Sequence, residues 1–129
     1  MKSVVICGSK RFKPEERKFA AKLRDLGVTV YDPYFHSGEK EWEGLSEAYK
    51  GFIALGLTHD HFYKIKMADI VYIFNKDGYV GVSTTLELGY AMALGKPIYA
   101  LSDKDTELCR KVLIRGILKT PKELLKKLK

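Results

Sequence analysis

The segment Ile70-Val71-Tyr72-Ile73-Phe74 decides the fold, because an unbroken apolar run rich in β-branched and aromatic residues predicts a strand buried on both faces. A similar run spans Val4 to Cys7 near the N-terminus and is closed by Gly8. Strands that are apolar on both faces occur where helices cover both sides of a parallel sheet. The two runs therefore predict an α/β protein.

A helix and a second strand are expected between these two runs. Pro14 suits the first turn of a helix, where its missing N–H costs nothing, and apolar residues recur at helical spacing until Gly27 ends the segment. Residues 28–31 predict a strand. Residues 32–44 predict a loop above the sheet, where ligand contacts commonly lie.

Helical spacing returns over residues 45–67. We expect two helices there with a break near residues 56–58, because Thr58 followed by Asp60 and His61 is typical of a helix start. Residues 83–94 predict a further helix, which Gly95 ends.

The C-terminal third predicts two more strands and one helix. Residues 97–101 form a short apolar run, and residues 112–114 are a candidate for a short fifth strand. Thr120-Pro121-Lys122-Glu123 is a capping box with proline at the first helical position, which predicts the start of the final helix.

Strands that alternate with helices predict right-handed crossovers and a single fold class. We expect a Rossmann-like or flavodoxin-like, doubly wound parallel sheet of four to five strands in a three-layer α/β/α domain over residues 1–129. Ligands of such sheets bind beyond the carboxyl ends of the strands at the switch point, here between the strands at 4–7 and 70–74. The loops that contain Gly8 and Gly81 should face each other there.

The composition excludes a disordered protein. The 129 residues are 46% hydrophobic and show no low-complexity tract, so the chain can bury a core. The first apolar run is too short for a signal-peptide core, and no apolar run approaches the roughly 20 residues that cross a bilayer. We expect a cytoplasmic protein without membrane contact, and we expect Cys7 and Cys109 to be buried thiols.

The net charge of +7 raises the question of nucleic acid. Much of the excess lies in lysines between Lys119 and Lys129, and lysines on a terminal helix usually form a solvated face. Aromatic residues are not interleaved with the basic ones as in nucleic-acid modules. A polynucleotide partner is therefore not expected, whereas a basic surface would attract a small phosphorylated ligand.

An anion site is predicted directly after the first strand. Gly8 allows close backbone approach, Ser9 can donate a hydrogen bond, and Arg11 can bind a phosphate bidentately beside the point charge of Lys10. The spacing is neither a Walker A loop nor the G-x-G-x-x-G dinucleotide pattern. A tight turn that carries solvated basic residues is the alternative.

The loop and helix start at 81–87 carry the most information. Gly81, Ser83, Thr84 and Thr85 lie where free backbone N–H groups and the helix dipole favour an anion or a polar ligand. Glu87 falls about one turn further into the helix. Its side chain has either a chemical role or a capping role toward Ser83 or Thr84.

Three parts of the chain together resemble the nucleoside 2-deoxyribosyltransferase-like superfamily, which includes the 2'-deoxynucleoside 5'-monophosphate N-glycosidases. The resemblance covers about three quarters of the chain in the right order. The matching pieces are Ile6-Cys7-Gly8-Ser9, Ile65-Lys66-Met67-Ala68-Asp69-Ile70-Val71, and Thr85-Leu86-Glu87-Leu88-Gly89-Tyr90-Ala91 followed by Gly95-Lys96-Pro97-Ile98.

The resemblance implies a function and site residues. The glutamate of the E-L-G-Y-A segment is the family's nucleophile, which implies that Glu87 attacks the anomeric carbon of a sugar. A carboxylate suits this step, because it stabilises and then captures an oxocarbenium-like centre. Ser9 and Arg11 resemble the family's phosphate-handling members, and Asp69 is a further expected substrate contact. The implied function is cleavage or transfer at the N-glycosidic bond of a nucleoside or nucleoside 5'-monophosphate, without a cofactor.

The chain departs from the family pattern beside the expected nucleophile. The family usually has a tyrosine at or just before the end of the first strand, where this chain has Val5, Ile6 and Cys7. It also commonly has an aspartate eight residues before the position of Asp69, and this chain has His61 there.

The sequence therefore does not decide which residue acts as the acid–base partner of Glu87. Asp60 or His61 is a candidate for protonating the leaving base, since the reference pKa of histidine suits proton transfer; an exposed helix histidine is the alternative. Asp77 is the candidate for a further family aspartate that precedes the glutamate.

The remaining expectations concern metals, aromatic residues and partners. His36 and His59 lack partners at zinc-like spacing, so no metal site is expected. Tyr31, Tyr34 and Phe35 either stack on a base or belong to the core. The resemblance implies a homodimer or higher homo-oligomer. The alternative function is a non-catalytic nucleotide-binding or sensor module of the same fold.

Overall fold

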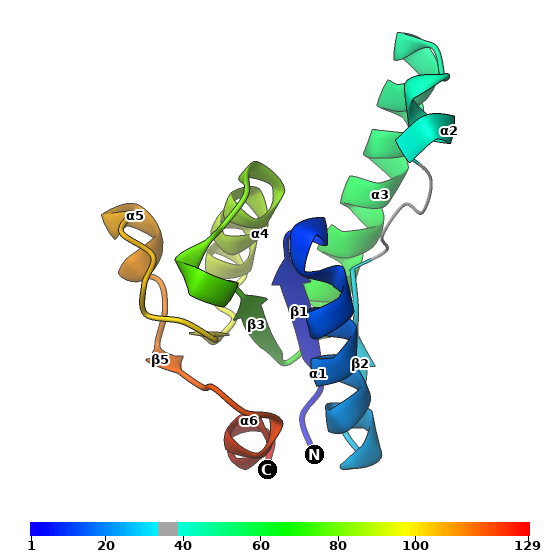
Figure 1. Ribbon diagram of the computed structural model, residues 1–129. Helices are drawn as coiled ribbons and strands as arrows, with labels where there is room; N and C mark the ends of the chain where they lie inside the picture. Colours follow the sequence, from blue (N-terminus) through cyan, green and yellow to red (C-terminus); the bar gives the residue numbers. More distant parts are fainter. Residues whose placement is uncertain (34–38) are drawn as a thin grey trace.

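The computed structural model describes residues 1–33 and 39–129 and has three layers, with a central parallel sheet between two layers of helices (Figure 1). The strand order is β2-β1-β3-β4-β5, with the switch point between β1 and β3. This confirms the predicted fold class. The strands are β1 (Val4–Gly8), β2 (Val30–Tyr31), β3 (Ile70–Phe74), β4 (Ile98–Ala100) and β5 (Gly116–Ile117).

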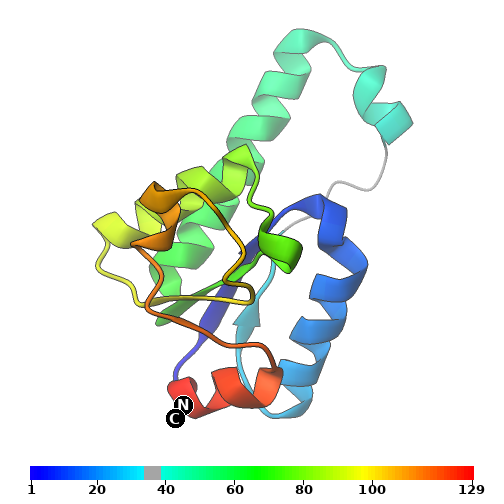
Figure 2. The ribbon, with the colours of Figure 1, turned by 60° about the vertical axis from the view of Figure 1, so that its left-hand side comes forward.

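The helices cover the two faces of the sheet unequally. On one face, α1 and α6 pack against each other and against the sheet, and on the other face α3 packs beside α4. The N-terminal half of α3 extends beyond the rest of the molecule with α2 at its far end (Figures 1 and 2). The α-helices are α1 (Lys13–Asp25), α2 (Glu39–Glu43), α3 (Glu47–Met67), α4 (Val82–Ala93), α5 (Leu108–Lys111) and α6 (Pro121–Leu128), and the 3-10 turns are η1 (Lys10–Phe12) and η2 (Lys76–Gly78).

The alternation of side chains along β1 divides the core into two halves. Val4 and Ile6 face α1 and α6, whereas Val5 and Cys7 face α3 and α4, and all four are fully buried. The run at 70–74 alternates in the same way, so both strands need apolar residues at every position. The packing thus explains why an unbroken apolar run predicted these strands.

The predicted break in the helix at 45–67 is wrong. A single helix, α3, runs from Glu47 to Met67, and Ser46 caps its start by accepting a hydrogen bond from the N–H of Tyr49. Gly56 lies within the helix with open space beside it, and one exposed glycine costs only about 1 kcal/mol. The helix-start pattern at Thr58 therefore does not interrupt it.

Other boundaries also differ from the sequence predictions. The strand expected at 112–114 is wrong, because the backbone that pairs with β4 lies at β5, where Gly116 is opposite Tyr99. The loop expected over 32–44 contains α2, and α5 was not predicted. Cys109 is exposed rather than buried, whereas Cys7 is buried as expected. Tyr34, Phe35 and His36 lie outside the described residues.

The predicted start of α6 is confirmed, with Thr120 as its N-cap. The Thr120 hydroxyl accepts a hydrogen bond from the N–H of Glu123, and the Glu123 carboxylate accepts one from the N–H of Lys119. Within the described residues, no helix combines the length and apolar character needed to span a bilayer.

Glu16 on α1 is expected to make the stability of the protein depend on pH. Glu16 is 1% exposed, and neither of its carboxyl oxygens has a hydrogen-bond partner within residues 1–33 and 39–129. Burial, with a contribution from the Asp32 carboxylate, raises the pKa of Glu16 from 4.5 to about 8. Because the folded state binds this proton more tightly than the unfolded state, the group's contribution to stability is complete below about pH 4.5. It is lost as the pH rises toward 8, by up to roughly 1.4 kcal/mol per pH unit.

Replacing Glu16 by glutamine should remove this dependence. We expect the free energy of unfolding of Glu16→Gln, measured by urea denaturation, to exceed that of the original protein increasingly between pH 5 and pH 8. Glu15→Gln, at the exposed neighbouring position, serves as the control. Parallel stability curves for Glu16→Gln and the original chain would contradict the assignment.

Candidate active site

A cleft of about 730 Å³ lies at the carboxyl edge of the sheet, beside the switch point between β1 and β3. The loop after β1 and the start of α4 both line it, as the sequence predicted for the loops at Gly8 and Gly81. One side of α3 forms another wall. The lining residues are Gly8, Ser9, Lys10, Pro33, Trp42, Glu43, Ala54, Leu57, Thr58, His61, Phe62, Tyr79, Gly81, Val82, Ser83, Thr84, Leu86 and Glu87.

Three side chains from three elements meet at the base of this cleft. The Oε2 atom of Glu87 on α4 lies 3.3 Å from the Nε2 atom of His61 on α3. The Sγ atom of Cys7 on β1 lies 3.2 Å from the same nitrogen. His61 is thus buried and paired with Glu87, and the exposed-helix interpretation of His61 is wrong.

The electrostatics of the pair follow from its burial. Burial raises the pKa of Glu87 from 4.5 to about 8. Burial, together with the nearby charge of Lys64, lowers the pKa of His61 from 6.5 to about 4. At neutral pH the pair therefore holds one proton and carries no net charge. The Nδ1 atom of His61 is buried and has no hydrogen-bond partner among the described residues, so no contact there fixes the tautomer of the ring.

The start of α4 presents free backbone donors to the cleft. Gly81 occupies the N-cap and supplies no side-chain cap, so the first N–H groups of the helix can bind a ligand. Ser83 is exposed in the cleft, whereas Thr84 is 2% exposed. Glu87 does not cap Ser83 or Thr84, since its carboxyl group contacts His61 on the neighbouring helix.

The loop after β1 has a different arrangement from the one its sequence suggested. The Ser9 hydroxyl accepts a hydrogen bond from the N–H of Arg11 and caps η1. The Arg11 guanidinium carbon lies 3.5 Å from the centroid of the Tyr79 ring, and Arg11 is not among the cleft-lining residues. Lys10, rather than Arg11, is the basic residue of this loop that lines the cleft.

Three aspartates that the sequence singled out lie away from Glu87. Asp60 is half exposed and forms an ion pair with Lys64 at 2.8 Å. Asp69 lies at the opposite end of β3, where its carboxylate accepts hydrogen bonds from the N–H and the hydroxyl of Ser3, and these bonds lower its pKa. Asp77 lies in η2 in a left-handed conformation and does not line the cleft. The expected ligand contact of Asp69 is therefore not supported by its position.

A family model described as nucleoside 2-deoxyribosyltransferase matches residues 4–124, which include the whole cleft and its cluster. This chain belongs to that family. Curated protein sequences gave no match to this member of the nucleoside 2-deoxyribosyltransferase family.

Two solved structures have the fold of this nucleoside 2-deoxyribosyltransferase family member. A 2-deoxyribosyltransferase from the psychrotolerant bacterium Bacillus psychrosaccharolyticus is 20% identical, with a TM-score of 0.66 over 95% of this chain and 89% of that one. A conserved protein from Enterococcus faecalis V583 is 15% identical, with a TM-score of 0.66 over 99% of this chain and 97% of that one. Similarity at this level of identity shows the fold.

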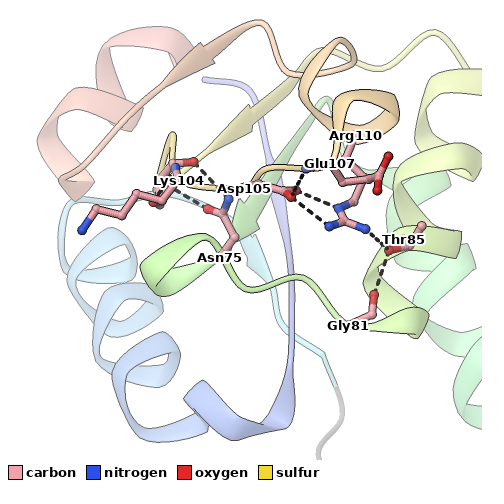
Figure 3. A network of polar contacts seen from close by, with 8 residues as sticks. Asn75, Gly81, Thr85, Lys104, Asp105, Glu107 and Arg110 are labelled. Carbon is pink, nitrogen blue, oxygen red and sulfur yellow. Dashed lines mark hydrogen bonds and ion pairs between the residues drawn. The ribbon is translucent and has the colours of Figure 1, made fainter.

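A polar network supports the start of α4 in this family member (Figure 3). The Asp105 carboxylate accepts two hydrogen bonds from Arg110, at 2.7 and 2.8 Å. An N–H of Arg110 lies 3.5 Å from the hydroxyl of Thr85, which donates to the carbonyl of Gly81 at 2.9 Å. Thr85 therefore fastens the first turn of the helix and does not line the cleft.

A second contact ties the loop before α4 to the loop after β4. Asn75 accepts hydrogen bonds from the N–H groups of Leu101 and Ser102 and donates to the Ser102 carbonyl. Gly78 has a φ of +84°, and a Cβ there would meet the backbone carbonyl carbon of Lys104 at 2.5 Å. The two loops pack closely only because Gly78 has no side chain.

Several residues that shape the site were not predicted from sequence. Asp105 and Arg110 form part of no recognisable motif, and Cys7 was assigned only to the core. Phe62 and Tyr90 stack with centroids 4.5 Å apart and join α3 to α4 next to the cluster. The apolar spacing of Phe62 and Tyr90 was visible in the sequence, but nothing in it indicated that the two helices are neighbours.

Proposed function

We propose that this chain cleaves or transfers the N-glycosidic bond of a nucleoside or nucleoside 5'-monophosphate, with Glu87 as the nucleophile. The observation that carries the proposal is the 3.3 Å contact between Glu87 and His61 at the base of the cleft. Because burial raises the pKa of Glu87 and lowers that of His61, the pair carries one proton at neutral pH. Transfer of this proton from Glu87 to His61 produces the carboxylate nucleophile and the imidazolium acid in one step. Membership of the family supports the same chemistry.

The first step forms a covalent glycosyl-enzyme. The proton of the pair moves from the Glu87 carboxyl group to the Nε2 atom of His61, which leaves a carboxylate beside an imidazolium. The carboxylate oxygen attacks the anomeric carbon as the C–N bond breaks, and the bonding electrons pass to the leaving base. His61 donates its proton to that base, and both residues end uncharged, with Glu87 bound to the sugar as an ester.

The second step frees Glu87. Water, or a second base that carries a ring N–H, attacks the anomeric carbon and gives its proton to His61 as the ester C–O bond breaks. Glu87 leaves as a carboxylate and recovers the proton from His61. Water as acceptor gives hydrolysis, and a second base gives transfer.

A 5'-phosphate suits the cationic and N–H-rich end of the cleft. Lys10 and Ser83 both line this cleft, as does the helix start that follows Gly81, where a side-chain cap is absent and the helix dipole favours an anion. Gly8 also lines this cleft, and a Cβ at this position would lie 3.0 Å from the Phe74 carbonyl oxygen on β3. Asp60 and Asp69 have no part in the proposed mechanism.

Release of free base is the direct test. The purified protein is incubated with a panel of nucleosides and nucleoside 5'-monophosphates, with and without a second base, and the products are separated by chromatography. We expect free base or an exchanged nucleoside from at least one monophosphate. Thermal stabilisation by these compounds without any base release would instead support a non-catalytic sensor module.

We also propose that two copies of the chain associate through α3 and the start of α4. The exposed half of α3 carries large apolar side chains at helical spacing, with Tyr49 53%, Phe52 70% and Leu55 57% exposed. On α4, Val82 is 82% and Leu86 59% exposed, and both line the cleft. A second copy would cover a self-complementary apolar surface and close one side of the cleft.

Charge at the centre of this surface should prevent association. We expect Phe52→Lys to raise the dimer dissociation constant at least roughly tenfold, measured by sedimentation equilibrium. Leu108→Lys, which changes a 70% exposed residue on α5, serves as the control and should leave association unchanged. A monomeric original protein, or equal effects of the two substitutions, would contradict the proposed interface.

A further inference from the structure

The cluster at the base of the cleft has a geometry that hydrogen bonds alone do not satisfy. Cys7 and Glu87 both approach the Nε2 atom of His61, at 3.2 and 3.3 Å. One ring nitrogen either donates one hydrogen bond or accepts one, so it cannot serve both neighbours equally. A sulfur, a nitrogen and an oxygen that all lie within 4.8 Å of one another are a candidate set of metal ligands.

A cysteine–histidine–glutamate catalytic triad does not fit the same arrangement. In a triad the nucleophile and the orienting carboxylate bind opposite nitrogens of the imidazole ring. Here both contact Nε2, and the Nδ1 atom has no partner among the described residues. Cys7 is also fully buried, so its sulfur is not placed to attack a substrate in the cleft.

Two of the three distances between these atoms are close to those of tetrahedral coordination. With zinc bond lengths of about 2.3 Å to sulfur and about 2.0 to 2.1 Å to nitrogen and oxygen, neighbouring ligand atoms lie about 3.3 to 3.6 Å apart. The two measured distances are close to this range, and all three ligand atoms lie within 4.8 Å of one another. Small side-chain adjustments would therefore suffice to hold an ion.

We propose that Cys7, His61 and Glu87 form a binding site for a divalent transition-metal ion, with Zn²⁺ as the best match. A thiolate and a carboxylate balance the two charges of the ion, and a neutral imidazole completes a site without net charge, which suits its burial. The sulfur and nitrogen ligands select against Mg²⁺ and Ca²⁺, which prefer oxygen. The cleft side of His61 and Glu87 leaves a fourth position for water or a ligand.

Metal binding would regulate the chemistry proposed above, and only this consequence rests on the proposed function. An ion that holds the Glu87 carboxylate and the His61 Nε2 atom removes both the nucleophile and the proton carrier. Zinc would thus act as a reversible inhibitor of base release. Whether the metal site exists does not depend on whether the protein releases base from any substrate.

Cobalt provides a test that needs no substrate. Titration of the purified protein with Co²⁺ is followed by absorption, since a thiolate ligand gives a charge-transfer band in the near ultraviolet and tetrahedral coordination gives intense visible bands. We expect these bands to saturate at one Co²⁺ per chain and to disappear on addition of Zn²⁺. Excess Mg²⁺ should leave them unchanged.

Substitutions locate the ion. Cys7→Ser should abolish the charge-transfer band, whereas Cys109→Ser, which changes the exposed cysteine, should retain it. Glu87→Gln and His61→Asn should each weaken cobalt affinity at least roughly tenfold. If Cys7→Ser does not fold, as judged by circular dichroism, these last two variants still decide the question.

Two results would overturn the metal site. One is the absence of cobalt bands at a tenfold excess of Co²⁺ over protein, and the other is a band that survives Cys7→Ser but is lost in Cys109→Ser. Base release without metal binding would remove only this inference. Metal binding without base release from any substrate would remove only the proposed function.

Discussion

Glu87→Gln is expected to reduce base release by a factor of at least about 10³, because an amide cannot form the covalent ester with the sugar. Glutamine keeps the size of this side chain, which is 12% exposed, and its amide N–H can still donate to the Nε2 atom of His61. The substitution should therefore remove the reaction without disturbing the packing of α4 against α3. The measurement is kcat/KM for the monophosphate that the original protein cleaves fastest, with circular dichroism to confirm the fold.

Asp60→Asn is the matched comparison for this experiment. Asp60 immediately precedes His61 but is half exposed and paired with Lys64 outside the cleft. Its substitution should change kcat/KM by less than roughly threefold, as is usual for exposed ion pairs. A Glu87→Gln protein that keeps more than a tenth of the original activity would rule out Glu87 as the nucleophile.

The pH dependence of kcat/KM is expected to be bell-shaped, with limbs near pH 4 and pH 8. The mechanism requires one proton on the Glu87–His61 pair. Since burial raises the pKa of Glu87 to about 8, the pair loses this proton above pH 8 and can no longer protonate the leaving base. Since burial lowers the pKa of His61 to about 4, the pair gains a second proton below pH 4 and the nucleophile is blocked. Each limb should approach a tenfold change per pH unit.

His61→Asn should reverse the alkaline limb. Without a proton carrier, the remaining reaction depends only on ionisation of Glu87, so the residual rate should rise through the pKa of Glu87 instead of falling. Substrates whose bases leave without protonation should suffer least from the substitution. A rate that rises and then stays level above pH 8 in the original protein would show that Glu87 acts without the shared proton.

The parts of the fold that the sequence predicted correctly are those fixed by local rules. The run at 70–74 and the run at 4–7 are apolar at every position, because helices cover both faces of each strand. Glycines at 27 and 95 adopt positive φ and end α1 and α4. The capping box at 120–123 starts α6, since its two hydrogen bonds involve neighbours in sequence.

The errors concern elements whose limits depend on distant contacts. A two-residue strand such as β5 has no periodicity of its own, and its position follows from pairing with Tyr99 and Ala100 on β4. The helix-start pattern at Thr58 does not begin a new helix. The helix α3 is continuous through this position, and it packs against α4. Local propensity therefore identified the elements better than it placed their ends.

The candidate site divides in the same way. The sequence indicated Glu87 and His61 separately, through the E-L-G-Y-A segment and through a count of residues before Asp69. Asp69 itself was misplaced as a ligand contact, since the strand that it precedes carries it to the opposite edge of the sheet. From the sequence, Asp60 and His61 were alternatives for protonating the leaving base. In the structure only His61 lines the cleft, because successive residues of a helix point in different directions and Asp60 pairs with Lys64.

The sequence by itself determined the buried strands at 4–7 and 70–74, the start of the final helix and the presence of a glutamate at the start of α4. Each of these follows from residues that are close together along the chain. Only the tertiary structure decided that Cys7 and Glu87 both contact the Nε2 atom of His61. It also decided that burial raises the pKa of Glu87, so that Glu87 and His61 together hold one proton. The physical reason is that distances of a few ångströms between residues on three separate elements are set by how the helices pack on the sheet. The loss of solvent that shifts their pKa values exists only once that packing is complete.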